Sequence, residues 1–270
     1  MRSIAIESDP IESIAMKKAL LVGINDYQCM PALRGCVNDA RLMGALVSEQ
    51  FLFAEGEIRT LLDGEAHFDS LYRELQWLFS NSGEPEEDTL FFYYSGHGYI
   101  YEDRDGDERD GLDEVLCAVD YRFDVGSGPD EWRHENGILD DELRRLVEGL
   151  HPSTRVEIVV DSCHSGGMFD FERGPVACQG RLPGNVVVWS ASRELEVAKE
   201  NHGEDVDHAG ETYGAFTQVL HELVSGKRAP VSRRQMFSAL REEMKRRGHG
   251  QAPVLFCPDI LERQPFLCFS

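Results

Sequence analysis

The chain has 270 residues, 41% of them hydrophobic, and its formal net charge at neutral pH is −22. A chain of this length and composition can bury a large apolar core, so we expect a globular fold. The excess of acidic residues argues against nucleic acid as a partner, because binding to phosphates depends on Lys and Arg, and it is compatible with binding of cations.

Short runs rich in Val, Ile, Leu and aromatic residues alternate with longer segments of helical period, which is typical of an α/β sheet. The predicted strands are Lys18–Gly23, Glu57–Leu62, Thr89–Tyr94, Val115–Val119, Arg155–Val160, Asn185–Trp189 and Pro253–Phe256. The predicted helices lie at 37–51, at 68–79, in DDELRRLVEGL (140–150), and at Tyr213–Val224 and Ser232–Arg247. Segments 101–114 and 171–185 are predicted to be loops because of their Gly, Pro and charge content, and 199–211 is a third polar stretch.

Two of the predicted strands end in residues that can perform chemistry. TLFFYYSGHG brings Ser95, His97 and Gly98 to one strand end, and VEIVVDSCHSGG brings Asp161 and Cys163 to another. Sites in open parallel sheets form at the carboxyl ends of the strands, so we expect the two ends to meet.

A thiol needs a base to attack a peptide carbonyl, and an imidazole on the second strand end can supply it. We therefore predict that Cys163 is a nucleophile and His97 its base, with the backbone amides of Cys163 and Gly98 as an oxyanion hole. His164 is the rival base, but as the sequential neighbour of Cys163 it tends to point away. The alternative for Cys163 is an inert core thiol.

No membrane-spanning run of roughly 20 apolar residues is present, and the N-terminus lacks the apolar core of a secretory signal. The seven cysteines include no C-x-x-C pair, so neither a disulfide framework nor a zinc ribbon is indicated. We therefore expect a cytoplasmic protein without a membrane partner.

YYSGHG followed by VVDSCHSG resembles the histidine and cysteine boxes of the caspase-like cysteine peptidases, and the DSCHSG version is similar to metacaspases and their prokaryotic relatives. The resemblance extends from KKALLVGIN through LRGCVNDA, DGLDEVLCAVD and ILDDEL to GAFTQVLHEL and QAPVLF. It implies a caspase-like (caspase-hemoglobinase) α/β sandwich, with a mostly parallel central sheet flanked by helices on both faces. It also implies peptide-bond hydrolysis by Cys163 as nucleophile, with His97 as general base and acid.

The resemblance further implies the organisation of the chain. Residues 1–16 are an N-terminal tail, and 17–270 form one catalytic domain. Within it, 17–170 resembles the large subunit of caspases, 171–184 is a linker, and 185–270 resembles the small subunit. Metacaspases resemble caspases in fold but commonly remain monomers, and a monomer is expected here.

The resemblance also bears on specificity. In metacaspases the first specificity pocket is acidic and accepts Arg or Lys, and the matching positions are Asp39, Asp161, Ser95 and Cys36. Two carboxylates that face one pocket favour a cation, and the fork of an Arg side chain is the best geometric fit. Cleavage after Asp is the alternative reading, because Arg34 lies close to where one pocket arginine of caspases would fall. A second alternative to the peptidase function is a scaffold protein that responds to calcium and has no catalytic activity.

Calcium is implied by the same resemblance, as a stimulating ion. The four aspartates that match the calcium-binding positions of metacaspases are Asp113, Asp140, Asp141 and Asp170. Carboxylate oxygens suit this hard cation, although about a dozen inserted residues around FDVGSGPDEWRHEN could displace the cluster. A second set, Asp103, Asp105, Asp107 and Glu114, has the spacing of an EF-hand, but Glu108 replaces its required Gly.

Two arginines, Arg173 and Arg181, lie among Gly and Pro after the cysteine box. An enzyme that cuts after Arg could cut itself there, or be cut by an upstream protease. A plain linker is the alternative interpretation of this segment.

The expected partner of the site is a protein or peptide with a basic residue before the cleaved bond.

Overall fold

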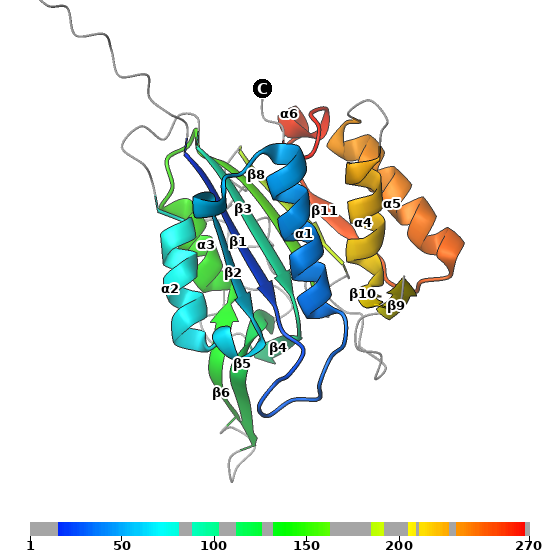
Figure 1. The fold of residues 1–270 in the computed structure, drawn as a ribbon. Helices are drawn as coiled ribbons and strands as arrows, with labels where there is room; N and C mark the ends of the chain where they lie inside the picture. Colours follow the sequence, from blue (N-terminus) through cyan, green and yellow to red (C-terminus); the bar gives the residue numbers. More distant parts are fainter. Residues whose placement is uncertain are drawn as a thin grey trace, which may run out of the picture.

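A six-stranded sheet forms the centre of the molecule (Figure 1). The structure, a computed structural model, describes residues 16–80, 88–102, 112–125, 132–162, 185–191, 205–208, 211–226 and 231–267. In spatial order the strands are β11 (Val254–Phe256), β8 (Val186–Ser190), β7 (Arg155–Asp161), β3 (Thr89–Ser95), β1 (Lys17–Gly23) and β2 (Ile58–Leu62). Neighbouring strands are parallel except β11, which runs antiparallel to β8. The six strands predicted at these places are present, each end within one residue of the prediction.

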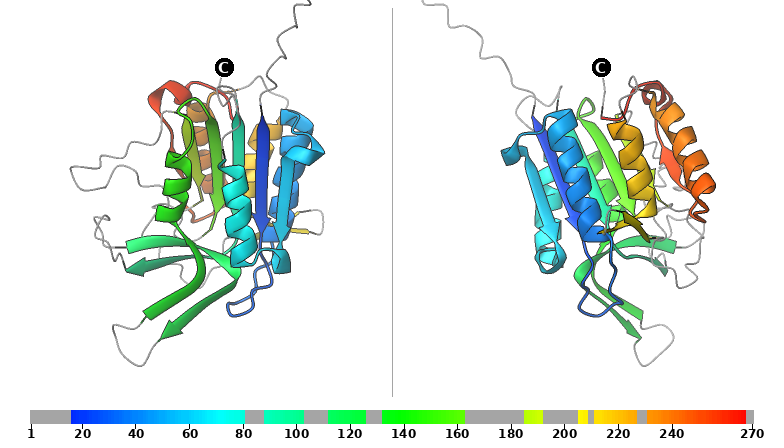
Figure 2. Two further views of the ribbon diagram at one scale, coloured as in Figure 1. Left: turned by 90° about the vertical axis from the view of Figure 1, so that its left-hand side faces the viewer. Right: turned by 45° about the vertical axis from the view of Figure 1, so that its right-hand side comes forward.

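Helices cover both faces of this sheet (Figures 1 and 2). On one face lie α1 (Cys36–Phe51), α4 (Ala215–Ser225) and α5 (Arg233–Arg247), and on the other lie α2 (Phe68–Leu78) and α3 (Asp140–Glu148). Short helical segments complete the chain: η1 (Glu55–Glu57), η2 (Asp63–Glu65) and α6 (Asp259–Glu262). The predicted α/β architecture, with a mostly parallel sheet between two helical layers, is confirmed.

The alternation of side chains along the central strands builds the two cores. In β3, Phe92 and Tyr94 join the core beneath α2 and α3, whereas Phe91 and Tyr93 join the core beneath α1, α4 and α5. Because both faces are covered, the strand is apolar throughout, as expected for a buried parallel strand. All four side chains are fully buried.

A second sheet of three antiparallel strands corrects the prediction. It consists of β4 (Gly98–Glu102), β5 (Leu112–Val125) and β6 (Trp132–Leu139). The prediction of a loop over 101–114 was wrong at both ends of that segment, where 101–102 belong to β4 and 112–114 to β5. Of the residues read as an insertion, 123–125 belong to β5 and 132–136 to β6. Charged residues can form a ladder of backbone hydrogen bonds without apolar alternation, so periodicity misses such strands.

A short hairpin, β9 (Asp205–His208) and β10 (Glu211–Gly214), occupies part of the polar stretch at 199–211. Its second strand lies against α1, because Asn38 donates from Nδ2 to the carbonyl of Thr212 at 3.0 Å and Arg34 donates to the Thr212 hydroxyl at 3.2 Å. The helix predicted from Tyr213 begins at Ala215 instead. The structure thus forms strands at 205–208 and 211–214, within and just beyond that polar stretch.

The part of the chain after the cysteine box is attached to β7 by a buried ion pair. Glu157 and Arg233 are both fully buried, and Arg233 donates to the two carboxylate oxygens at 3.0 and 2.6 Å. The indole of Trp189 and the backbone N–H of Leu267 also donate to Glu157, at 2.7 and 3.0 Å. The carboxylate thus joins β7 to β8, α5 and the C-terminal segment.

We expect Arg233→Met to lower the free energy of unfolding by about 3–5 kcal/mol, because it leaves the Glu157 charge buried without its cation. Urea denaturation followed by circular dichroism measures this. The double variant with Glu157→Leu is expected to recover part of the loss. Equal stability of wild type and Arg233→Met would contradict the importance of the pair.

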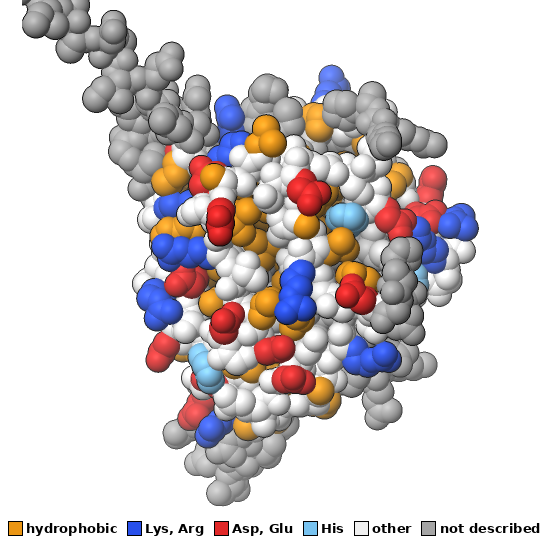
Figure 3. Space-filling model, in the orientation of Figure 1, with side chains coloured by type: hydrophobic (Ala, Val, Ile, Leu, Met, Phe, Trp, Pro, Cys, Tyr) orange, Lys and Arg blue, Asp and Glu red, His pale blue; other side chains and the backbone are white. Residues whose placement is uncertain are grey.

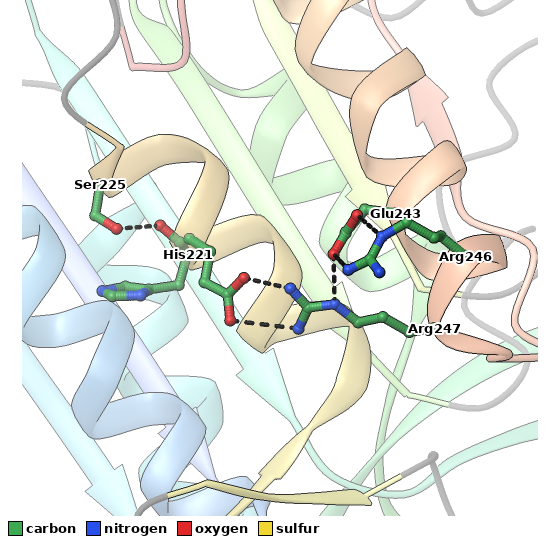
Figure 4. Close-up of polar contacts among 6 residues, drawn as sticks. His221, Ser225, Glu243, Arg246 and Arg247 are labelled. Atoms are coloured by element: carbon green, nitrogen blue, oxygen red, sulfur yellow. Dashed lines mark hydrogen bonds and ion pairs between the residues drawn. The ribbon is translucent and has the colours of Figure 1, made fainter.

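At the outer surface, ion pairs join α4 to α5 (Figure 4). Arg247 donates to Glu222 at 2.5 Å and to Glu243 at 2.7 Å, and Arg246 donates to Glu243 at 2.6 Å. Hydrogen bonds from Arg246 and then Arg247 lower the pKa of the Glu243 carboxyl to about 2. Arg246 and Glu222 are exposed and Glu243 and Arg247 are partly exposed, so water screens the pairs and they add little stability.

Acidic and basic side chains are interspersed over the side of the molecule that Figure 3 shows. On this face the negative charge is therefore not gathered into one patch. Among the described residues, no helix is both long and apolar enough to cross a membrane.

Candidate active site

The carboxyl ends of the three central strands lie at one level of the sheet. Ser95 at the end of β3 pairs with Gly23 of β1 on one side and with Asp161 of β7 on the other. The N–H of Gly96 continues the contact by donating to the carbonyl of Asp161 at 3.3 Å. The structure therefore brings together the two strand ends that the sequence singled out.

Gly23 allows α1 to reach this edge. A Cβ atom at Gly23 would lie 2.3 Å from the carbonyl oxygen of Cys36, so a larger residue would push the start of α1 away. The side chain of Asn25 then accepts the backbone N–H of Cys36 at 2.9 Å, and supplies an acceptor for the otherwise unsatisfied first turn of the helix. The N-terminus of α1 is thereby placed beside the ends of β1 and β3.

His97 lies two residues after the end of β3 and is 9% exposed. Its Nε2 atom lies 2.8 Å from the carbonyl oxygen of Pro31. Because a carbonyl only accepts, Nε2 carries the proton of the neutral ring and Nδ1 is the basic nitrogen. Pro31 thus sets the tautomer in which His97 takes up a proton at Nδ1.

Two tyrosines hold the backbone of His97. The N–H of His97 donates to the hydroxyl of Tyr27 at 2.7 Å, and the hydroxyl of Tyr94 donates to the carbonyl of His97 at 2.7 Å. The rings of Tyr27 and His97 also contact each other, with centroids 4.7 Å apart. A Cβ atom at Gly96 would lie 2.4 Å from the Tyr27 hydroxyl, so only glycine leaves room for this arrangement.

Gly98 begins β4, opposite Leu116 of β5. The preceding pair is hydrogen-bonded, since the N–H of Cys117 donates to the carbonyl of His97 at 3.1 Å. Hydrogen-bonded and non-bonded pairs alternate in an antiparallel ladder, so the N–H of Gly98 faces away from β5. The N–H of Gly98 therefore makes no hydrogen bond to β5.

The cysteine box continues from β7. Asp161 ends that strand and the buried Ser162 follows it. Cys163, the predicted nucleophile, is the next residue and lies outside the described residues, as do His164, Asp170, Arg173 and Arg181.

Asp39 lies in the first turn of α1 and is 1% exposed. Its Oδ1 atom accepts the N–H of Gly214 at 2.9 Å, and its Oδ2 atom accepts the Ser95 hydroxyl at 3.0 Å. Buried carboxylates are tolerated where such donors compensate the charge. Asp39 and Ser95, two of the predicted pocket residues, are therefore in direct contact.

Asp161 is 7% exposed, and burial raises the pKa of its carboxyl above the ordinary value, with hydrogen bonds from Thr217 acting in the opposite direction. Those bonds come from the Thr217 hydroxyl at 2.6 Å and its backbone N–H at 3.2 Å, both to Oδ2. A Cβ atom at Gly214 would lie 2.6 Å from Oδ2 of Asp161 and 2.9 Å from Oδ2 of Asp39. The two carboxylates thus approach each other across Gly214.

Cys36 begins α1 within the same turn as Asp39, and its side chain is buried. Arg34 is exposed and bonds to Thr212 of β10. All four predicted pocket residues are therefore at the carboxyl edge of the sheet or the adjoining start of α1.

The predicted calcium ligands among the described residues, Asp113, Asp140 and Asp141, lie in or beside the second sheet. Val115 of β5 pairs with Leu139 of β6, so the backbone brings Asp113 toward the start of α3, where Asp140 is buried. Asp141 forms salt bridges with Arg144 and with Arg145, the latter at 2.5 Å.

These aspartates fit a calcium ion only in part. Two arginines neutralise Asp141, and no group of three or more potential metal ligands occurs among the described residues, which leave out Asp170. Of the EF-hand-like set, Glu114 is buried in β5 and its three partners lie outside the described residues.

Comparison with known proteins identifies the family. A family model described as metacaspase, peptidase C14 domain, matches residues 17–172, more than half of the chain. The chain therefore belongs to the metacaspases of the peptidase C14 family, a family of cysteine-type peptidases, which are hydrolases. The resemblance seen in the two boxes is confirmed.

Curated proteins with similar sequences support the same family. Metacaspase-1A of Aspergillus terreus is 38% identical over 161 residues, which are 57% of this chain and 37% of the relative. Metacaspase-1 of Botryotinia fuckeliana is 38% identical over 161 residues, again 57% of this chain and 35% of the relative. The chain thus spans little more than a third of the length of these curated relatives.

The crystal structure of protein GSU0716 from Geobacter sulfurreducens superimposes with a TM-score of 0.63 at 23% identity, over 93% of this chain and 98% of that one. At this identity the likeness concerns the fold alone. Together with the family match, it confirms the predicted caspase-like α/β fold.

Several residues at this edge were not singled out from the sequence: Pro31, Tyr27, Tyr94, Tyr93, Gly214 and Thr217. Gly214 and Thr217 belong to GAFTQVLHEL, which carried the resemblance, but nothing in that string shows that they face two carboxylates. Pro31 acts through its carbonyl, a group that every residue has. Such contacts depend on tertiary structure.

Proposed function

We propose that this chain is a cysteine endopeptidase that hydrolyses peptide bonds after Arg or Lys. The observation that best supports this is the pair of buried carboxylates, Asp39 and Asp161, beside the strand end that carries His97. Two negative charges in one pocket favour a cationic side chain, and the guanidinium fork of Arg can bond to carboxylates through two donors.

The proposed reaction begins at the thiol of Cys163, which lies outside the described residues. His97 takes the proton of the Cys163 thiol at Nδ1, and the thiolate attacks the carbonyl carbon of the peptide bond. The N–H groups of Gly98 and Cys163 stabilise the oxyanion that forms. His97 then protonates the leaving amine, and water, deprotonated by His97, hydrolyses the thioester to release the acid and restore the thiol.

A panel of fluorogenic peptides tests the proposal. The peptides end in Arg, Lys, Asp or citrulline, and are assayed with calcium or with chelator on wild type and Cys163→Ala. We expect turnover of the Arg and Lys peptides by wild type alone. Preference for Asp would support the caspase-type alternative, and no turnover of any peptide would support a non-catalytic scaffold.

We further propose that calcium stimulates the enzyme through Asp113, Asp140, Asp141 and Asp170. Calcium, when bound, supplies positive charge that compensates neighbouring carboxylates. The clustering of Asp113 with the start of α3 supports the proposal, and the arginines on Asp141 oppose it.

In the Cys163→Ala background, we expect calcium to raise the melting temperature more than magnesium does, because a ligand that binds only the folded state stabilises it. Asp140→Asn should reduce this increase, whereas Asp69→Asn, an exposed acid on α2, should not. Equal shifts with both metals would argue against a calcium site.

Processing at Arg173 or Arg181 is a further part of the proposal. Incubated wild-type protein is expected to yield fragments that end between 171 and 184, as read by intact mass. Cys163→Ala alone should stay whole and be cut when active wild type is added. Identical fragmentation of Cys163→Ala alone would defeat self-cleavage.

We also propose a cytoplasmic monomer that acts on protein substrates. Cys29 and Cys257 are free thiols in the described part of the chain, which suits a reducing compartment. Light scattering coupled to size-exclusion chromatography tests the oligomeric state.

A further inference from the structure

Both acidic side chains of the pocket are held by the start of helix α4. Gly214 is its N-cap residue and donates its N–H to Asp39. Thr217 lies in the first turn and donates its N–H and its hydroxyl to Asp161. The first N–H groups of a helix have no partner within the helix and carry partial positive charge. They therefore offset two negative charges that are buried close together.

Behind Thr217 lies Tyr93 of β3, and both residues are fully buried. The Tyr93 hydroxyl is 2.6 Å from the Thr217 hydroxyl oxygen. The Thr217 hydroxyl has one proton, and the carboxylate of Asp161 can only accept, so this proton goes to Asp161 and Tyr93 donates to Thr217. Burial raises the pKa of Tyr93 well above its ordinary value, so its phenol keeps the proton that this chain of donors needs.

We propose that Thr217 is a positioning residue of the specificity pocket, which fixes Oδ2 of Asp161 against α4 and leaves Oδ1 to receive the cation of the substrate. Tyr93 assists by orienting the Thr217 hydroxyl. Within the described part of the chain, both hydrogen bonds at the Asp161 carboxylate go to Oδ2. The inference rests on the proposed function, because it assumes that the pocket binds Arg or Lys.

A valine at position 217 keeps the shape of threonine but removes the hydroxyl. The hydrogen bond from the Thr217 hydroxyl acts against burial on the pKa of Asp161, so its loss raises that pKa and the pocket loses its charge at a higher pH, while the backbone N–H of residue 217 still donates to Oδ2. The titratable groups that face this region from the described elements are Asp39 and Cys36 of α1, Tyr93 of β3 and Tyr213 of β10.

The test measures binding in the Cys163→Ala background, by calorimetry over the acidic to neutral range, with a short peptide ending in Arg and its citrulline twin. Thr217→Val is expected to weaken binding of the Arg peptide about 10- to 100-fold, the range for a hydrogen bond to a charged group. Binding of the citrulline peptide should change much less. The acid-side loss of Arg binding should move to higher pH, and Thr217→Ser should restore both properties.

A double variant separates the lost hydrogen bond from crowding against Tyr93. Tyr93→Phe combined with Thr217→Val removes the phenol oxygen that a valine methyl would crowd. Recovery of Arg binding in the double variant, or an unchanged Arg-to-citrulline ratio in Thr217→Val, would overturn the inference. Absence of Arg binding to Cys163→Ala itself would overturn it too. Failure of wild type to cut Arg peptides while Cys163→Ala still binds them would count against the proposed reaction alone.

Discussion

Cys163→Ala and His97→Gln are each expected to lower kcat/KM for an Arg peptide by about 10⁴-fold or more, the scale seen when one member of a catalytic unit is removed. The physical reason is that the thiol is a weak nucleophile until a base takes its proton. Because Pro31 binds Nε2 of His97, Nδ1 is the nitrogen that performs this task. Steady-state kinetics with the fluorogenic Arg peptide measures the loss.

His164→Gln is the matched control, since it removes the imidazole next to Cys163 without touching His97. We expect it to retain most of the activity. A loss as large as that of His97→Gln would assign the base to His164. Circular dichroism of each variant excludes unfolding as the cause.

Asp161→Asn is expected to lower kcat/KM for the Arg peptide by about 10²- to 10³-fold, mainly through KM. Removal of one partner of a buried, hydrogen-bonded charge pair costs about 2–5 kcal/mol, and the expected loss lies in the middle of that range. The citrulline peptide lacks the positive charge, so its kcat/KM should change little. The ratio of the two substrates isolates the charge of the pocket from the catalytic step.

The pH dependence has a defined sign. Burial raises the pKa of Asp161, so the carboxylate gains its proton earlier than an exposed aspartate as pH falls. Preference for Arg over citrulline should therefore decline as pH falls, and at a higher pH than the titration of an exposed aspartate would give. Asp69→Asn removes the same charge from the exposed surface of α2, and should leave that preference unchanged. Equal effects of Asp69→Asn and Asp161→Asn would mean that overall charge, rather than the pocket, attracts Arg.

Secondary structure was predictable where a segment is covered by the core. The strand that ends at Ser95 is buried on both faces and reads as an uninterrupted apolar run, and α2 shows its buried face by the spacing of Leu71, Leu75 and Leu78. The prediction failed at β6 and β9, whose polar residues carry no such pattern. Their strand conformation depends on a neighbouring strand that a local reading does not contain.

The candidate site also has features that the sequence predicts and features that it does not. The identity of Cys163, His97, Asp39 and Asp161 as chemically capable residues could be read from the sequence, because glycine-flanked reactive side chains at two strand ends form a recognisable pattern. Which nitrogen of His97 is basic could not, since it depends on a carbonyl 66 residues away in the chain.

By itself, then, the sequence determined the α/β class, the two reactive strand ends and the family. The tertiary structure alone decided how two buried carboxylates are accommodated side by side. Gly214 and Thr217 lie more than fifty residues from Asp161, and only folding brings the start of α4 to both acids. A carboxylate buried without those donors would be too costly to keep charged, so the pocket depends on contacts that span the chain.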